Sequence, residues 1–120
     1  MAVRAETRDA TLVIAVLDER LMEPTQIKRL SDDLQGLLGK AEQTQVVLDF
    51  ERVQFMSSAM LGKLVQFHKK CKEFKVNLKL SGVSSEIYEV FKITRLHKLF
   101  DFQPDVGAAC KSFSKRGFWG

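Results

Sequence analysis

The sequence predicts a single α/β domain whose mixed, mostly parallel sheet opens with an antiparallel hairpin. Runs rich in β-branched and aromatic residues alternate with stretches of helical periodicity. The first two strand candidates are joined by Arg8-Asp9-Ala10, a tight turn typical of a hairpin. Later runs are separated by helical stretches long enough for right-handed crossovers between parallel strands. We expect about five strands with about four helices packed on them.

Length and composition are those of a globular domain. The chain has 120 residues, of which 45% are hydrophobic and 28% are charged. Its longest strongly apolar run, Leu12–Leu17, is too short to span a bilayer. The N-terminus carries no signal-peptide pattern. We expect a domain over residues 1–113 and a C-terminal tail over residues 114–120, in which Phe118 and Trp119 either pack on the body or form a terminal contact site.

The cysteines and histidines predict neither a metal site nor a cofactor. Cys71 and Cys110 belong to no CxxC pair, and His68 and His97 are not spaced as metal ligands. The two cysteines allow one disulfide, but their apolar helical contexts favour free thiols in a reducing compartment. We therefore expect a cytoplasmic protein.

The net charge is +4, and the basic residues gather in one segment. A basic patch can attract nucleic acid, anionic lipid or an acidic protein. Aromatic residues do not interleave with these lysines as a base-stacking platform requires, which favours a solvated helix face over a nucleic-acid site. The lysines are Lys63, Lys69, Lys70, Lys72, Lys75 and Lys79.

The first half of the chain predicts a hairpin followed by a helix. Val3–Arg8 and Thr11–Leu17 are the two strands, and the second is nearly continuous in apolar residues, as in a strand covered on both faces. Asp18–Glu23 is polar and turn-like, and Pro24 suits the first turn of a helix that ends near Lys40. The apolar stripe of this helix is Ile27, Leu30, Leu34, Leu37, Leu38 and Ala41.

The middle of the chain predicts a strand, a short connection and a second helix. Val46–Phe50 is the strand. In the connection Glu51–Met56, Val53 and Phe55 alternate with polar residues, so part of it is expected to be extended and half buried. The helix runs from about Ser58 to Phe74. Its inner stripe is Leu61, Leu64, Val65, His68 and Cys71.

The last part of the chain predicts two further strands and two helices. Val76–Leu80 and Leu99–Phe102 are the strands. Ser84 or Ser85 caps a short helix between them, and Pro104 opens the last helix. The inward residues are Ile87, Val90 and Phe91 in the short helix, and Val106, Ala109, Cys110 and Phe113 in the last.

Ser57 and Ser58 lie where the central connection turns into its helix. A serine at a helix N-terminus commonly caps the unpaired N–H groups. The same N–H groups and the helix dipole also stabilise a phosphoryl group on such a serine. In open α/β sheets this region, beyond the carboxyl ends of the strands, commonly carries function.

The stretch VVLDFERVQFMSSAMLGKL resembles the central motif of STAS domains, the fold of bacterial anti-sigma factor antagonists. That motif has a strand ending in Asp, an apolar connection, typically Asp-Ser-Ser-Gly-Leu-Gly, and a helix. LKLSGVSSEIYEVFKITRLHKLFDF continues the resemblance, which covers nearly the whole chain and is weaker before Val46. It implies a STAS-like fold.

Four residues of this motif define the expected phosphorylation site or differ from the residues usual in the family. Ser58 stands at the phosphorylatable serine and is the first candidate phosphoacceptor. Ser57 stands where the family usually has Asp and is the second choice. Ala59 replaces the following Ser, and Met60 replaces the Gly.

The resemblance implies a phosphorylation switch. The unphosphorylated domain would bind an anti-sigma factor, often itself a Ser/Thr protein kinase, phosphorylation of Ser58 would weaken the complex, and a phosphatase would reset it. The implied partner-binding residues are Ser57, Ser58, Met60, Lys63 and Phe67. Met60 suits a protein contact or the core equally well.

Three other functions compete with this switch. One is a STAS scaffold or interaction domain without phosphoregulation, which the altered motif favours. Another is an enzyme using Ser58 as a nucleophile with His68 or His97 as base, but the chain has no GxSxG elbow. The last is small-ligand or nucleotide binding, for which the sequence has neither a P-loop nor GxGxxG. We expect no enzymatic activity, and the sequence does not indicate an oligomeric state.

Overall fold

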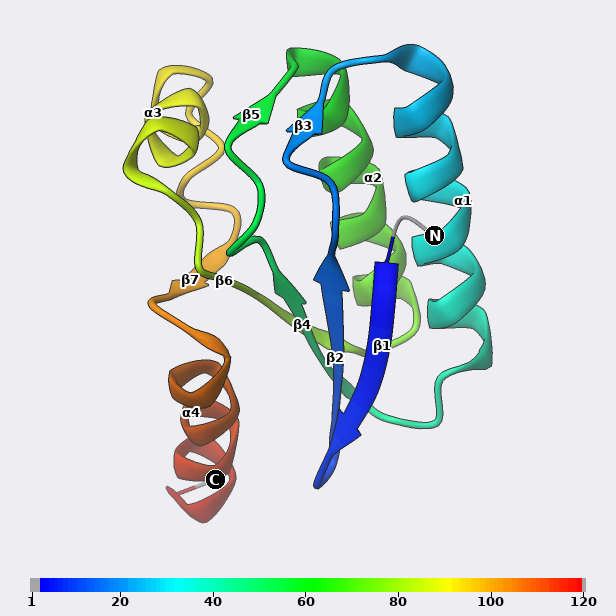
Figure 1. Cartoon of the computed structure of the whole chain (residues 1–120). Coiled ribbons are helices and arrows are strands. Elements are labelled where there is room, and N and C mark those ends of the chain that lie inside the picture. Colours follow the sequence, from blue (N-terminus) through cyan, green and yellow to red (C-terminus); the bar gives the residue numbers. More distant parts are fainter. Residues whose placement is uncertain (1–2, 120) are drawn as a thin grey trace.

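The computed structural model describes the backbone of residues 3–119 and the side chains of residues 3–113. It confirms the predicted fold class: a five-stranded mixed sheet with the order β1-β2-β4-β6-β7 (Figure 1). Only β1 and β2 are antiparallel, and the other neighbours are parallel. The strands are β1 Val3–Arg8, β2 Thr11–Val16, β4 Gln45–Asp49, β6 Asn77–Ser81 and β7 Asp101–Gln103.

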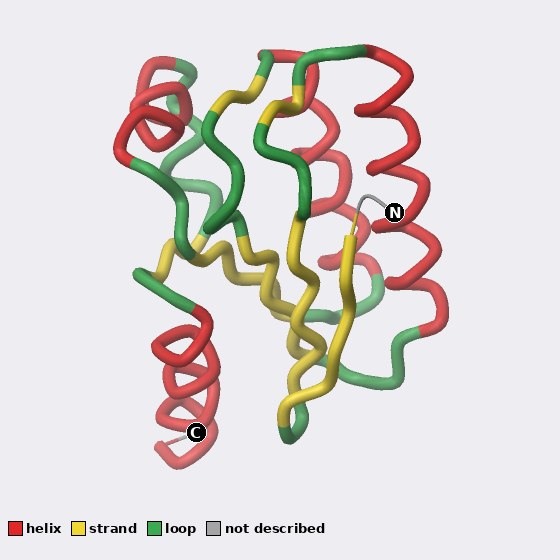
Figure 2. Tube along the Cα trace, viewed as in Figure 1, coloured by secondary structure: helices red, strands yellow, loops and turns green. Residues whose placement is uncertain are grey.

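Within residues 3–119, four helices pack on the sheet. Side chains that alternate along the strands point to opposite faces of the sheet and form two apolar clusters. One cluster includes residues of α1, α2 and α3, and the other includes residues of α4. In Figure 2, α1 and α2 run alongside each other, and α4 stands apart from them. The bounds are α1 Pro24–Lys40, α2 Ser58–Glu73, α3 Ser85–Ile93 and α4 Val106–Trp119. Among residues 3–119, no helix is long and apolar enough to cross a membrane.

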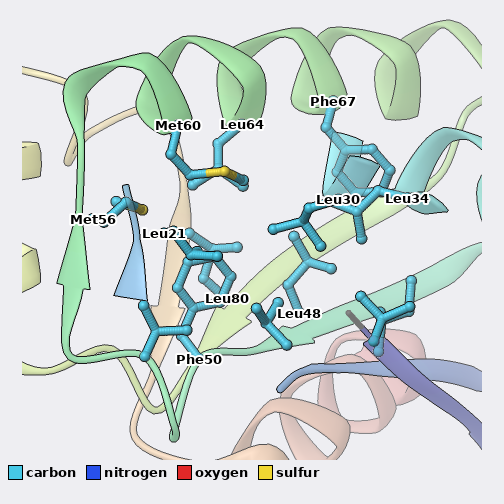
Figure 3. Packing of buried hydrophobic residues seen from close by; sticks show 14 of the residues in the cluster. Leu21, Leu30, Leu34, Leu48, Phe50, Met56, Met60, Leu64, Phe67 and Leu80 are labelled. Atoms are coloured by element: carbon cyan, nitrogen blue, oxygen red, sulfur yellow. The ribbon is translucent and has the colours of Figure 1, made fainter. Parts of the chain in front are cut away.

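The main core lies between the sheet and the pair α1 and α2 (Figure 3). Its stripe on α1 follows the predicted spacing, with Ile27, Leu30 and Leu34 nearly inaccessible to solvent. Burying each such side chain contributes roughly 1.5–3 kcal/mol. The side chains labelled in Figure 3 are Leu21, Leu30, Leu34, Leu48, Phe50, Met56, Met60, Leu64, Phe67 and Leu80.

Helix α4 covers the opposite face of the sheet. Asp105 precedes the helix, and its Oδ1 accepts a hydrogen bond of 2.8 Å from the backbone N–H of Ala108. Ala109 and Phe113 pack on Val13 and Val47, which lie on adjacent strands. The predicted inward side of this helix is confirmed. Its backbone stays helical to Trp119, while the side chains of the predicted tail, including Phe118 and Trp119, lie outside the described residues.

The connection Asp18–Glu23 differs from its prediction. It is not only a turn, because Arg20–Leu21 forms a short strand, β3, which pairs in parallel with β5, Phe55–Met56. Leu21 is fully buried. Of the two apolar residues that alternate in the second connection, Val53 is buried, whereas Phe55 is 47% exposed. Two residues are too few to show an alternating pattern, and this pair forms only because the fold brings the two connections together.

Candidate functional site

The chain leaves β4 through a tight turn that leads toward the serine junction. The backbone N–H of Phe50 donates to the carbonyl of Ser81 at 2.8 Å, and the N–H of Glu51 donates to Oδ1 of Asp49 at 3.0 Å. Gly82 lies against this turn with φ of +67°, and a Cβ there would come within 3.1 Å of the Glu51 nitrogen. Glycine adopts this φ without steric cost, and its missing Cβ leaves the turn room.

The segment before the serines is held by the connection between β2 and α1. The carbonyl of Glu19 accepts from the N–H groups of Gln54 at 2.8 Å and Phe55 at 3.1 Å. The N–H of Ser57 donates to the carbonyl of Leu21 at 3.0 Å. The start of α2 is therefore positioned by β3, a strand more than thirty residues earlier in the chain.

The amide side chain of Gln26 secures this connection to α1. Its Nε2 donates to the Arg20 carbonyl at 2.6 Å, and its Oε1 accepts from the N–H groups of Met22 and Glu23 at 3.1 and 3.3 Å. One glutamine thus satisfies three backbone groups around the first turn of the helix, where such groups lack intrahelical partners.

The two serines have different environments. Ser57 is the N-cap residue of α2, and its carbonyl accepts from the N–H of Met60 at 3.1 Å. Its Oγ is buried and has no hydrogen-bond partner within the described part of the chain. Ser58 is the first residue of α2 and is exposed. The structure thus places a solvent-accessible hydroxyl at the helix N-terminus beside a buried one.

We expect Ser57→Ala to change the free energy of unfolding by less than about 0.5 kcal/mol, because the Ser57 hydroxyl makes no capping bond. Ser84→Ala is the matched control at the N-cap of α3. The Ser84 Oγ accepts from the N–H of Ile87 at 3.2 Å, so its removal should cost about 1 kcal/mol. Urea denaturation of both variants measures the difference. Equal losses would show that Ser57 also caps its helix.

The expected partner-binding side chains do not all reach the surface. Met60 is fully buried, and Phe67 is only 2% exposed. Both belong to the main core, which corrects the expectation that they form a contact surface and resolves the two alternatives for Met60. Ser58 is exposed, and Ser57 and Lys63 are half-buried.

Two exposed apolar side chains lie near the serines instead. Met22 follows β3 and is 45% exposed. Phe55 lies in β5, and the Arg20 guanidinium is 4.6 Å from the centroid of its ring. Figure 1 shows β3, β5 and the start of α2 at the same end of the molecule. Met22 and Phe55 were not among the predicted contact residues. The sequence gives no clear signal for them, because each is next to an apolar residue that is buried, Leu21 beside Met22 and Met56 beside Phe55.

His68 lies too far from Ser58 to act as its base. His68 lies ten residues further along α2, about 15 Å along the helix axis. Its ring packs edge-on against Phe100 with a centroid distance of 5.2 Å. Burial, and secondarily the Lys72 ammonium, lower the pKa of His68 from its usual 6.5. His97 contacts Tyr88 on α3, with ring centroids 6.2 Å apart.

Both cysteines are free, as predicted. Burial raises the pKa of the Cys71 thiol to about 12, which keeps it protonated and unreactive. Among the described residues, no group of three or more histidine, cysteine or acidic side chains is arranged to hold a metal ion.

Solved structures similar to this chain share its whole fold. A STAS domain protein from Planctomyces limnophilus, described as an anti-sigma-factor antagonist, has a TM-score of 0.81 at 23% identity, with 93% of this chain and 98% of that chain covered. SpoIIAA from Bacillus in its phosphorylated form has a TM-score of 0.67 at 18% identity, covering 92% and 99%. A structure described as part of the stressosome, a signal integration and transduction hub, has a TM-score of 0.76 at 11% identity, covering 95% and 98%.

The likeness to these structures supports the fold, and the family match rests on the sequence itself. The STAS domain family matches residues 3–109, which include every strand of the sheet, the serine junction and the first turn of α4. Antagonists of anti-sigma factors with this fold are generally not enzymes. The chain belongs to the STAS domain family.

Proposed function

We propose that this protein is a cytoplasmic antagonist of an anti-sigma factor, switched by phosphorylation of Ser58. In the unphosphorylated state it binds an anti-sigma factor that is also a Ser/Thr protein kinase, and a phosphatase restores that state. The observation that carries the proposal is the exposed hydroxyl of Ser58 at the start of α2, at the family's phosphoacceptor position.

The difference in solvent exposure between the two serines favours Ser58 over Ser57 as the phosphoacceptor. A kinase must bring the γ-phosphorus of ATP to within bonding distance of the attacking oxygen, which an exposed Oγ allows. The Ser57 Oγ is inaccessible to solvent, so phosphoryl transfer to it requires the start of α2 to open. A phosphate on Ser58 would be stabilised by the positive end of the helix dipole.

The surface around Ser58 has the features of a protein contact. Met22 and Phe55 supply apolar area, and Arg20 and Lys63 supply positive charge. Aromatic residues, methionine and arginine are enriched at protein–protein interfaces relative to the rest of the surface. A phosphate within this surface adds negative charge and bulk, which weaken a complex formed around the neutral hydroxyl.

The test is incubation of the protein with candidate anti-sigma factor kinases and ATP, followed by intact mass and site mapping. We expect one phosphoryl group on the wild type and on Ser57→Ala, and none on Ser58→Ala. We expect Ser58→Glu to weaken the kinase complex by at least about tenfold. Isothermal titration calorimetry measures that change.

The matched control is Ser85→Glu, which places the same charge at the exposed first residue of α3. It should bind the kinase as the wild type does. Binding that is unchanged in Ser58→Glu, or a phosphate that persists in Ser58→Ala, would contradict the assignment of Ser58.

A second candidate is an interaction domain without phosphoregulation. The departures at Ser57, Ala59 and Met60 favour it, because the acidic neighbour and the glycine usual in the family are both absent from the sequence. Under this function the protein binds its partner through the Met22 and Phe55 surface, and candidate kinases leave Ser58 unmodified. Partner binding lost in Phe55→Ala and unaltered in Ser58→Glu would identify it.

A further inference from the structure

The outer edge of β1 is accessible along most of its length. β1 ends the strand order of the sheet, and five of its six residues, Arg4–Arg8, are exposed. An edge strand offers a row of unpaired backbone groups to another strand. In Figure 1 the strand lies at the front of the molecule, with α1 beside it.

A shallow groove of about 350 Å³ accompanies this edge. It lies between β1 and α1. Ala5 and Gly36 are its small residues, and a Cβ placed on Gly36 would meet no atom within 4 Å. The groove thus has room for backbone or side chains from outside. Its lining is Val3, Ala5, Asp32, Asp33, Gly36, Leu37 and Lys40.

The hairpin determines which backbone groups of β1 point outward. Its loop is the two-residue turn Asp9-Ala10, closed by the pair Arg8 and Thr11. In a hairpin of this type the closing residues bond to each other, and the bonding direction then alternates along the strand. The N–H and C=O groups of Val3, Ala5 and Thr7 are therefore directed away from β2.

The sequence of β1 is complementary to itself in one antiparallel register. Pairing two copies about a two-fold axis at Ala5 joins the outward backbone groups of Ala5 to their counterparts in the second copy. It also places Arg4 opposite Glu6 of the second copy, and Glu6 opposite Arg4. Opposite charges directly across an antiparallel pair are stabilising. In the isolated chain Glu6 contacts Arg8 at 3.5 Å, so it exchanges one arginine partner for another.

The charges on the exposed face of α1 are complementary to those of a second copy related by the same two-fold axis. Gly36 lies midway between Asp32 and Lys40 in the sequence and lines the groove with Ala5. An antiparallel second copy of α1 therefore brings Lys40 toward Asp32, and the missing side chain of Gly36 allows the helices to approach. In the isolated chain Asp32 contacts Lys28 at 3.1 Å in an exposed pair, which is weak and easily exchanged.

We infer that a second copy of this chain adds its β1 to this edge, so that one continuous sheet runs through a two-fold symmetric dimer with the two α1 helices side by side. The occupant is a second copy because β1 and α1 are each self-complementary in charge about one axis. Charged residues also protect edge strands from pairing, but Arg4 and Glu6 differ in sign, so in this antiparallel register two copies attract each other. This surface is separate from the Ser58 site, and the dimer does not depend on phosphorylation.

Charge reversal tests this pairing. Sedimentation equilibrium of the full chain up to about 1 mM should show a dimer. Arg4→Glu and Glu6→Arg should each raise the dimer dissociation constant on the order of tenfold or more, because each creates two like-charge pairs. The double variant Arg4→Glu/Glu6→Arg should restore the dimer, and an equimolar mixture of the two single variants should form a heterodimer.

Two further measurements distinguish this pairing from other contacts. Arg52→Glu makes the same charge change in the turn after β4 and should dimerise as the wild type does. In the dimer, amide hydrogen exchange should slow at Ala5 and Thr7. Circular dichroism confirms that each variant is folded. A wild type that stays monomeric at about 1 mM, or a dimer that withstands both single reversals, overturns the inference, and a monomer leaves this edge to a strand of another protein.

Discussion

Replacing Met60 by alanine is expected to lower the free energy of unfolding by about 2–4 kcal/mol. Met60 is fully buried in the core that α2 forms with the sheet, where Figure 3 shows its side chain near Leu64. The loss combines the transfer free energy of the deleted atoms with a cavity that the neighbouring side chains fill only in part. Urea denaturation followed by circular dichroism measures it as a lower midpoint with an unchanged slope.

The control is Met22→Ala, which deletes the same atoms from a side chain that is 45% exposed. It should change the free energy of unfolding by less than about 0.5 kcal/mol. Equal losses at the two positions would contradict the assignment of Met60 to the core. A larger loss of stability for Met60→Ala than for Met22→Ala would show that Met60, at the family's glycine position, contributes to core packing. A buried Met60 side chain does not cover the surface around Ser58.

Replacing Asp101 by alanine is expected to lower the free energy of unfolding by about 2 kcal/mol, because it leaves a buried ammonium without its carboxylate. The Lys79 side chain is 5% exposed, and its Nζ contacts Oδ2 of Asp101 at 2.5 Å. It also lies 4.9 Å from the ring centroid of Phe113 on α4. The Asp101 side chain is 43% exposed, so in the variant water can partly take the place of the missing carboxylate. The expected loss of stability is therefore smaller than for a fully buried pair.

Lys79→Met is the matched control, because it keeps most of the buried stem and removes the charge. It should stay within about 1 kcal/mol of the wild type, since losing the ion pair also removes the cost of desolvating the ammonium. Thermal and urea denaturation of both variants measure the asymmetry. A larger loss for Lys79→Met than for Asp101→Ala would show that the ion pair itself stabilises the fold.

Much of the fold follows from local sequence patterns. The three- and four-residue spacing of apolar residues predicts α1 and α2 to within a residue of their observed ends, because a buried helix face must repeat with the helical period. The turn at Asp9 and Ala10 predicts the hairpin of β1 and β2. The inward side of α4 is also predicted, since its apolar residues recur with the same period.

The pairing of β3 with β5 and the burial of Lys79 do not follow from such patterns. Each depends on a segment that is distant in the sequence. β3 and β5 meet because the sheet brings two short connections together. Lys79 alternates with apolar residues in β6 and reads as solvent-facing, but α4 covers it.

For the candidate site, the sequence by itself determined the family, the serine junction and the position of Ser58 at the start of a helix. Only the tertiary structure decided which side chains there are accessible. It buries the Ser57 hydroxyl, Met60 and Phe67, and it exposes Met22 and Phe55. The physical reason is that periodicity tells which side of a helix faces the core, whereas the accessibility of a side chain at a helix terminus depends on whether another part of the chain packs over it.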